Sequence, residues 1–141
     1  VQEPLRKSGV TPVKPYEAPM EVPLVLIVDD DPAVRDIVTE VVSDGGFGCR
    51  NASSGEEAIS LLNADRCQAL IVDIGFGRDH VKGWLVARRA RAFDPSLPVI
   101  YITGGSTDEW AVHGVPNSIL LSKPFTPAQL LTALSQLLKD W

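Results

Sequence analysis

Runs of aliphatic residues alternate along this chain with longer stretches in which apolar residues recur every third or fourth position. The first run, PLVLIVD at 23–29, is continuously apolar from Leu24 to Val28. Such a run is too short for a globular helix and is typical of a strand buried on both faces of a sheet. The remaining strand candidates are FGCRNA (47–52), QALIVD (68–73), LPVIYIT (97–103) and NSILLS (117–122).

Each stretch that follows a strand carries the end signals and spacing of a helix. After the first strand, Asp31 is an N-cap candidate, Pro32 suits the first turn, and Gly45-Gly46 favours an end. The apolar face of this helix is expected to consist of Val34, Ile37, Val38, Val41 and Val42. Four further helices are predicted from the Ser54–Glu57 capping box, over 83–93, over 106–112 with Ser106 as cap, and from Thr126-Pro127.

Strict alternation of strand and helix predicts one doubly wound α/β domain, with a five-stranded parallel sheet and five helices on its two faces. We assign residues 23–141 to this domain. Residues 1–22 contain prolines at 4, 12, 15 and 19 without helix or strand periodicity, and are interpreted as an extended arm or linker. The only methionine is Met20, so we expect either a piece of a longer protein or a natural start near Met20.

Composition narrows the function classes. The chain has 141 residues, 45% of them hydrophobic, which is enough to bury the core of one domain. Its net charge of -5 gives no basic surface for nucleic acid, and no apolar run reaches the ~20 residues of a membrane helix. We therefore expect a cytoplasmic protein that binds neither. Cys49 and Cys67 lack metal-site spacing and are interpreted as small residues in or near a core.

Polar residues stand where the predicted strands end. Asp29 and Asp30 follow the first strand, Asp73 ends the third, Thr103 the fourth and Lys123 the fifth. Because ligands of doubly wound folds bind beyond the carboxyl ends of the strands, these five side chains are expected to converge. Gathered carboxylates repel by ~4 kcal/mol at 4 Å and an effective dielectric of 20, so they require a cation. Oxygen ligands favour Mg²⁺, and a metal, a lysine and a hydroxyl together suit phosphoryl transfer.

The stretches LIVDDDP, LIVDI, YITG and LLSKPF resemble, in order and spacing, the motifs of the response-regulator receiver domain of two-component signalling. The resemblance spans roughly 24–138 and implies a flavodoxin-like sheet in the order 2-1-3-4-5. It also implies that Asp73 accepts a phosphoryl group from a histidine kinase or a histidine phosphotransfer protein. Asp29 and Asp30 would hold Mg²⁺ together with Asp73 and the backbone carbonyl of Gly75.

The resemblance gives the remaining site residues a role in handling the phosphoryl group. Thr103 would hydrogen-bond one phosphoryl oxygen and report the modification, and Lys123 would pair with another. The Lys123–Pro124 bond is expected to be cis. Such a domain is a signalling phosphoacceptor and not an enzyme, apart from its intrinsic phosphotransfer and autodephosphorylation chemistry. Asp31 is better explained as the helix N-cap.

The sequence departs from the family pattern at two places near the expected phosphorylation site and output surface. The loop after Asp73 is about two residues longer than usual and lacks the common Met-Pro, and Leu120 stands where the family often carries Tyr or Phe. The face formed by the fourth helix, the fifth strand and the fifth helix, including Trp110, is the implied surface for a downstream protein or a homodimer. Since no effector domain follows Trp141 in this sequence, output is expected through another protein or an upstream domain.

Two other functions stay open from the residues. A pseudo-receiver would use the same fold for phosphorylation-independent binding. A phosphatase of the haloacid dehalogenase type would use the Asp29-x-Asp31 pattern, but it would leave Asp73 without a role and the chain has no room for a cap domain.

Several residues outside the expected site have structural interpretations. His80 is expected in a solvated loop. Two interpretations of Trp84 and Leu85 stay open, namely that one of the pair is exposed or that both pack in the core. The three arginines of the third helix are expected on its solvent face: Arg88, Arg89 and Arg91.

Overall fold

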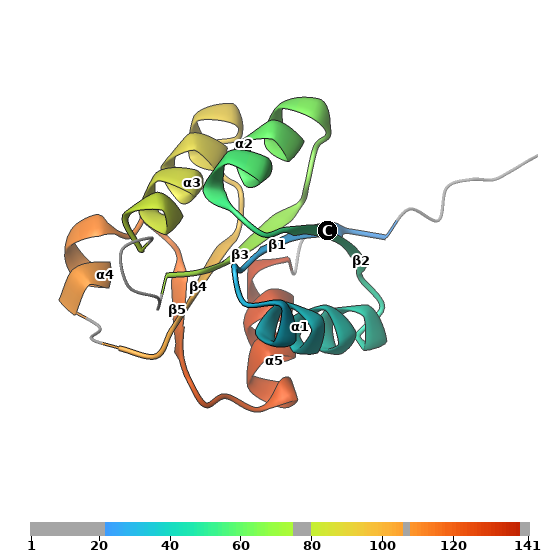
Figure 1. Cartoon of the computed structure of the whole chain (residues 1–141). Helices are drawn as coiled ribbons and strands as arrows, with labels where there is room; N and C mark the ends of the chain where they lie inside the picture. The colour runs from blue at the N-terminus through green and yellow to red at the C-terminus, as the bar shows by residue number, and fades with distance from the viewer. Residues whose placement is uncertain (1–21, 75–79, 106–107, 139–141) are drawn as a thin grey trace, which may run out of the picture.

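The computed structural model describes residues 22–74, 80–105 and 108–138, in which five strands form one parallel sheet in the order β2-β1-β3-β4-β5 (Figure 1). The strands are β1 (Leu24–Val28), β2 (Gly48–Ala52), β3 (Ala69–Asp73), β4 (Val99–Thr103) and β5 (Ile119–Ser122). The helices are α1 (Pro32–Asp44), α2 (Gly55–Ala64), α3 (His80–Phe93), α4 (Asp108–His113) and α5 (Pro127–Leu137). The predicted doubly wound fold and its strand order are confirmed. The expected arm at 1–22 lies outside the described residues except for Val22.

The sheet separates two hydrophobic cores. Helices α1 and α5 cover one face, and α2, α3 and α4 cover the other (Figure 1). Successive residues of β1 point to opposite faces, so Leu26 packs with α2 and α3 whereas Ile27 packs with α1 and α5. The same alternation places Tyr101 in the first core and Ile102 in the second. Burial on both faces explains why the central strands are continuously apolar.

Helix α1 begins as predicted, but its apolar face is narrower than expected. The Asp31 side chain accepts a hydrogen bond from the Ala33 amide at 3.0 Å, which confirms it as the N-cap. Val38 and Val42 are buried, whereas Ile37 is 59% exposed. The helical spacing alone did not distinguish Ile37 from the buried positions, because it lies at the border of the apolar stripe.

The capping boxes predicted for α2 and α5 differ in detail. At α5, Thr126 accepts from the Gln129 amide, and the Gln129 side chain accepts from the Thr126 amide, as a capping box requires. At α2, Ser54 accepts from the Glu57 amide, but the Glu57 carboxylate accepts from the amide and hydroxyl of Ser53. The Glu57 carboxylate therefore binds Ser53, the residue before the N-cap, and not the N-cap itself.

Helices α3 and α4 differ from the sequence prediction at their ends. Helix α3 begins at His80, three residues before the predicted start, so the interpretation of His80 as a loop residue was wrong. Helix α4 spans Asp108–His113, while the predicted cap Ser106 lies outside the described residues. Of the bulky pair in α3, Trp84 is buried and Leu85 is 43% exposed, so of the two alternatives the structure has the one with a single exposed side chain.

Arg91 joins the end of α3 to the loops around it. Its guanidinium donates to the backbone carbonyls of Leu97 at 2.6 Å and Pro116 at 2.7 Å. The expectation of a solvent-facing side chain was therefore wrong for Arg91, although Arg88 and Arg89 are exposed. Five donors in a fixed fork let one arginine satisfy several loop carbonyls, and residue spacing does not reveal such a use.

The two cysteines have free thiols, and each lies half-buried against a different core: Cys49 beside α1 and α5, and Cys67 beside α2 and α3. Their interpretation as small residues near a core is confirmed. None of the helices in the described ranges is both long enough and apolar enough to cross a membrane.

Replacing Tyr101 by Phe is expected to lower the free energy of unfolding by about 1 kcal/mol. The Tyr101 ring is fully buried and packs on Trp84 with ring centroids 4.7 Å apart, and its hydroxyl accepts a hydrogen bond from the buried Val115 amide at 3.1 Å. Phenylalanine keeps the ring contact and removes only that acceptor. Urea denaturation at constant m-value measures the change, and an unaltered midpoint would contradict this role for the hydroxyl.

Candidate functional site

The polar residues predicted to converge lie at the carboxyl ends of β1, β3, β4 and β5. Lys123 Nζ is 2.5 Å from Asp73 Oδ2, and the Lys123 backbone amide donates to the Thr103 carbonyl at 2.8 Å. The Asp73 side chain is only 2% exposed, and that of Lys123 is 23% exposed. The ion pair is therefore shielded from water on the aspartate side and open on the lysine side. The peptide bond between Lys123 and Pro124 is cis, as expected.

Asp29 lies next to Asp73 and is buried. Its Oδ1 accepts a hydrogen bond from the Asp31 amide at 2.9 Å, while Oδ2 is buried and accepts no hydrogen bond from the described residues. Burial raises the pKa of Asp29 from its ordinary value of 3.8 to about 7, and the neighbouring charge of Asp73 adds to the rise. Two carboxylates at this spacing need either a shared proton or a cation between them.

Thr103 faces the same edge of the sheet from β4. It is only 3% exposed, and its Oγ1 accepts a hydrogen bond from the Gly105 amide at 3.0 Å. That bond uses an oxygen lone pair and leaves the hydroxyl proton for another acceptor. A phosphate oxygen placed near Asp73 would offer such an acceptor.

The two other expected metal ligands are Asp30 and Gly75. Asp30 is exposed, whereas Asp29 is buried. Among the described residues, no three acidic, histidine or cysteine side chains are close enough to form a metal-binding group by themselves. Gly75, the expected carbonyl ligand, lies outside the described residues. The structure thus brings Asp29, Asp73 and Lys123 together and leaves Asp30 at the solvent border.

Arg35 is a neighbour of the site that the sequence analysis missed. Its Nη1 donates to the backbone carbonyl of Asp29 at 2.9 Å, which ties α1 to the end of β1. Side chains of a helix point back toward its N-terminus, so an arginine four residues after the Asp31 cap can reach that carbonyl. The four-residue spacing between Asp31 and Arg35 was therefore the sequence signal that could have predicted this contact.

The residues fit a divalent cation. Asp29 Oδ2, which accepts no hydrogen bond from the described residues, and the neighbouring Asp73 carboxylate offer oxygen ligands at this edge of the sheet. Mg²⁺ prefers oxygen ligands and keeps several waters, so it suits a site with few protein ligands. The ammonium of Lys123 lies beside Asp73 Oδ2 and would pair with an anion at the same site.

Fold and site together define a doubly wound α/β domain with paired carboxylates and a lysine at the carboxyl edge of its sheet. Residues 25–135 match the family described as response regulator receiver domain. The chain belongs to this family, and the resemblance seen in its motifs is confirmed.

The similar proteins agree with this assignment. Over 117 residues the chain is 32% identical to the response regulator MprA of Mycolicibacterium vanbaalenii, covering 82% of this chain and 50% of that protein. The chain thus spans about half the length of the curated relatives it matches. A response regulator receiver protein from Sinorhizobium medicae is 42% identical over 86% of this chain and 98% of its own, with a TM-score of 0.79. The Vibrio cholerae chemotaxis protein CheY4 is 26% identical over 82% of this chain and 98% of its own, with a TM-score of 0.74.

Proposed function

We propose that this receiver domain takes a phosphoryl group onto Asp73 and changes its affinity for a partner protein when it does so. The observation that carries the proposal is the shielded ion pair of Asp73 and Lys123 beside Asp29 Oδ2, an oxygen that accepts no hydrogen bond from the described part of the chain. This arrangement supplies a nucleophilic carboxylate, a cation for a phosphate oxygen and ligands for a metal. Catalysis of phosphoryl transfer consists mainly of such positioning and charge neutralisation.

The donor is a phosphohistidine of a kinase or of a phosphotransfer protein. A carboxylate oxygen of Asp73 attacks phosphorus, an O–P bond forms, and the N–P bond to the donor breaks with its electron pair going to the histidine nitrogen. Lys123 leaves the Asp73 oxygen and pairs with a phosphoryl oxygen. The Thr103 hydroxyl donates to another phosphoryl oxygen.

Asp29, Asp30 and Asp73 would hold Mg²⁺, together with the Gly75 carbonyl. When bound, the metal neutralises the charge that gathers on the phosphoryl oxygens. Asp31 takes no part in this set because its carboxylate already caps α1. That use of Asp31 also weighs against the haloacid dehalogenase alternative, in which the second acid of the Asp-x-Asp pattern would be a proton donor.

The output surface is proposed at α4, β5 and α5. A groove of about 610 Å³ runs between α4 and β5, and Val112 of α4 is 75% exposed beside it. The groove is lined by Asp108, Trp110, Ala111, Ser118, Ile119, Leu120 and Ser122. Leu120 pairs with Tyr101 in the sheet, and Thr103 pairs with Ser122. A shift of Thr103 toward the phosphoryl group would therefore be transmitted to the strand that forms the groove, for a downstream protein or a second copy of the domain to sense.

Intact mass after incubation with acetyl phosphate and Mg²⁺ tests the proposal. The protein is expected to gain one phosphoryl group, and the gain is expected to disappear when a chelator removes the metal. A folded protein that gains no mass would contradict phosphorylation and favour the pseudo-receiver. Continuous release of phosphate from a phosphate ester would instead indicate a phosphatase, and we expect no such release. The proposed setting is the cytoplasm, where histidine kinases present their phosphohistidine.

A further inference from the structure

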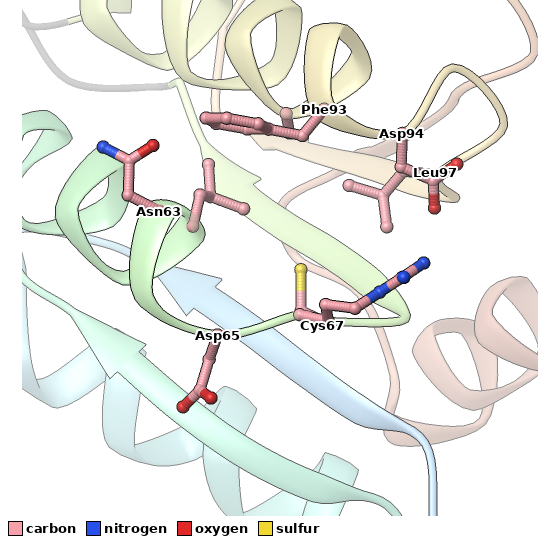
Figure 2. Close-up of a pocket in the computed structure, with 9 residues that line it drawn as sticks. Asn63, Asp65, Cys67, Phe93, Asp94 and Leu97 are labelled. Atoms are coloured by element: carbon pink, nitrogen blue, oxygen red, sulfur yellow. The ribbon is translucent and has the colours of Figure 1, made fainter.

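A second feature lies at the opposite edge of the sheet from Asp73. A pocket of about 260 Å³ opens between the C-terminal ends of α2 and α3 (Figure 2). The segment 65–67 enters β3 and the segment 94–97 enters β4, so the pocket sits at the amino ends of the strands. It shares no residue with the phosphorylation site, and the proposed function leaves it unexplained.

The pocket has an apolar part beside a polar one. Leu62 and Leu97 line it together with Phe93, whereas Asn63, Asp65, Arg66 and Asp94 supply polar groups. The thiol of Cys67 points toward α3 (Figure 2). Burial raises the pKa of Cys67 to about 11, so the thiol is neutral and behaves as a small apolar group. Phe93 forms one wall and is 55% exposed, which leaves much of its ring in water. The pocket volume is sufficient for one large apolar side chain, and burying the Phe93 ring would favour its entry.

The two carboxylates at the rim differ in their partners. Asp65 pairs with Arg50 at 2.7 Å. Asp94 accepts from the amide and hydroxyl of Ser96, both at 3.1 Å, and its charge acts on Arg91 and on the Cys67 thiol. The negative charge of Asp65 is thus paired, whereas that of Asp94 is still felt inside the pocket.

Two arginines at and near the rim are not paired with these acids. Arg66 lines the pocket and makes no hydrogen bond or ion pair within the described part of the chain. Arg89 is exposed one helical turn before Phe93, on the same side of α3. Within the described ranges these two arginines have no ion-pair partner, and with the apolar part of the pocket they complement an apolar side chain flanked by carboxylates.

We propose that this pocket is a docking site for a partner protein, which inserts one aromatic side chain whose sequence neighbours are acidic. The exposed Phe93 ring and the leucines that line the pocket select the aromatic group, and Arg66 and Arg89 select the acidic flanks. Because the pocket is remote from Asp73, binding is independent of phosphorylation. The domain would hold this partner in both signalling states.

Titration of the unphosphorylated ¹⁵N-labelled protein with three capped tripeptides tests the proposal. The peptides share a central tryptophan and differ only in two flanking residues, which are glutamate, glutamine or lysine. The glutamate peptide is expected to bind about three- to tenfold more tightly than the lysine peptide, as expected for one or two partly exposed ion pairs. The backbone amide shifts of Cys67, Asp94 and Leu97 should move during the titration.

Three variants make the test specific. Arg66→Glu leaves Arg89 beside a new carboxylate, so the preference for the glutamate peptide over the lysine peptide is expected to disappear. Arg88→Glu makes the same charge change on α3, but the Arg88 guanidinium lies against His113 of α4, so the order is expected to persist. Phe93→Ala removes an exposed ring and is expected to weaken all three peptides at least threefold without unfolding the domain. Equal affinities of the wild type for the three peptides, shifts confined to another surface, or an unchanged order in Arg66→Glu would each overturn the proposal.

Discussion

The Asp73→Asn protein is expected to gain no phosphoryl group from acetyl phosphate and Mg²⁺, whereas the wild-type protein gains one. Asparagine keeps the size of the side chain but lacks the anionic oxygen that attacks phosphorus, so the loss is expected to be complete. Removing the negative charge also breaks the ion pair with Lys123. Intact mass spectrometry at several time points measures the result.

The matched control is Asp31→Asn, which removes a carboxylate two residues beyond Asp29. Asp31 caps α1 through the Ala33 amide, and asparagine is an equally good N-cap. This variant is therefore expected to be phosphorylated as readily as the wild type. Phosphorylation of Asp73→Asn at Asp29 would contradict the assignment and revive the haloacid dehalogenase alternative.

Replacing Asp29 by Asn is expected to stabilise the metal-free protein, and increasingly so as the pH rises. The folded protein keeps the Asp29 proton up to a pKa of about 7, while the unfolded chain releases it near 3.8. Between these values the folded state binds more protons, so the contribution of Asp29 to stability falls as the pH rises through this window. The advantage of Asp29→Asn should therefore grow by about 2 to 3 kcal/mol between pH 5 and pH 8.

Thermal unfolding with a chelator at pH 5 and pH 8 gives the difference in Tm between variant and wild type. This difference is expected to increase by roughly 5 to 10 °C from pH 5 to pH 8. Added Mg²⁺ should stabilise the wild type at pH 8, because a cation that binds the ionised carboxylates favours the folded state. It should stabilise Asp29→Asn much less. An advantage for Asp29→Asn that is the same at both pH values would show that Asp29 is not protonated in the folded protein.

The fold was predictable because its signals are local and mutually consistent. Continuously apolar strands report burial on both faces, and caps such as Asp31 and Thr126 report helix starts independently of tertiary contacts. The positions of the site residues followed from the same reasoning, since the carboxyl ends of parallel strands share one edge. Asp29, Asp73, Thr103 and Lys123 all stand at that edge.

The features that sequence reasoning missed depend on tertiary contacts. Arg91 was expected in solvent, yet it reaches two loop carbonyls that adjoin α3 only in the folded chain. Ile37 fits the apolar spacing of α1 but lies beyond the edge of its core. The pocket beside Phe93 is built by two helix ends and two strand entries, and no short segment contains its pattern.

The separation of the two cores by the sheet has a consequence for how such a domain diverges. Leu26 and Ile27 are neighbours in the chain but belong to different cores, so substitutions at the two positions share few contacts. Their effects on stability should be nearly additive. A lineage can thus remodel the helices on one face for a new partner while the packing on the other face remains as inherited.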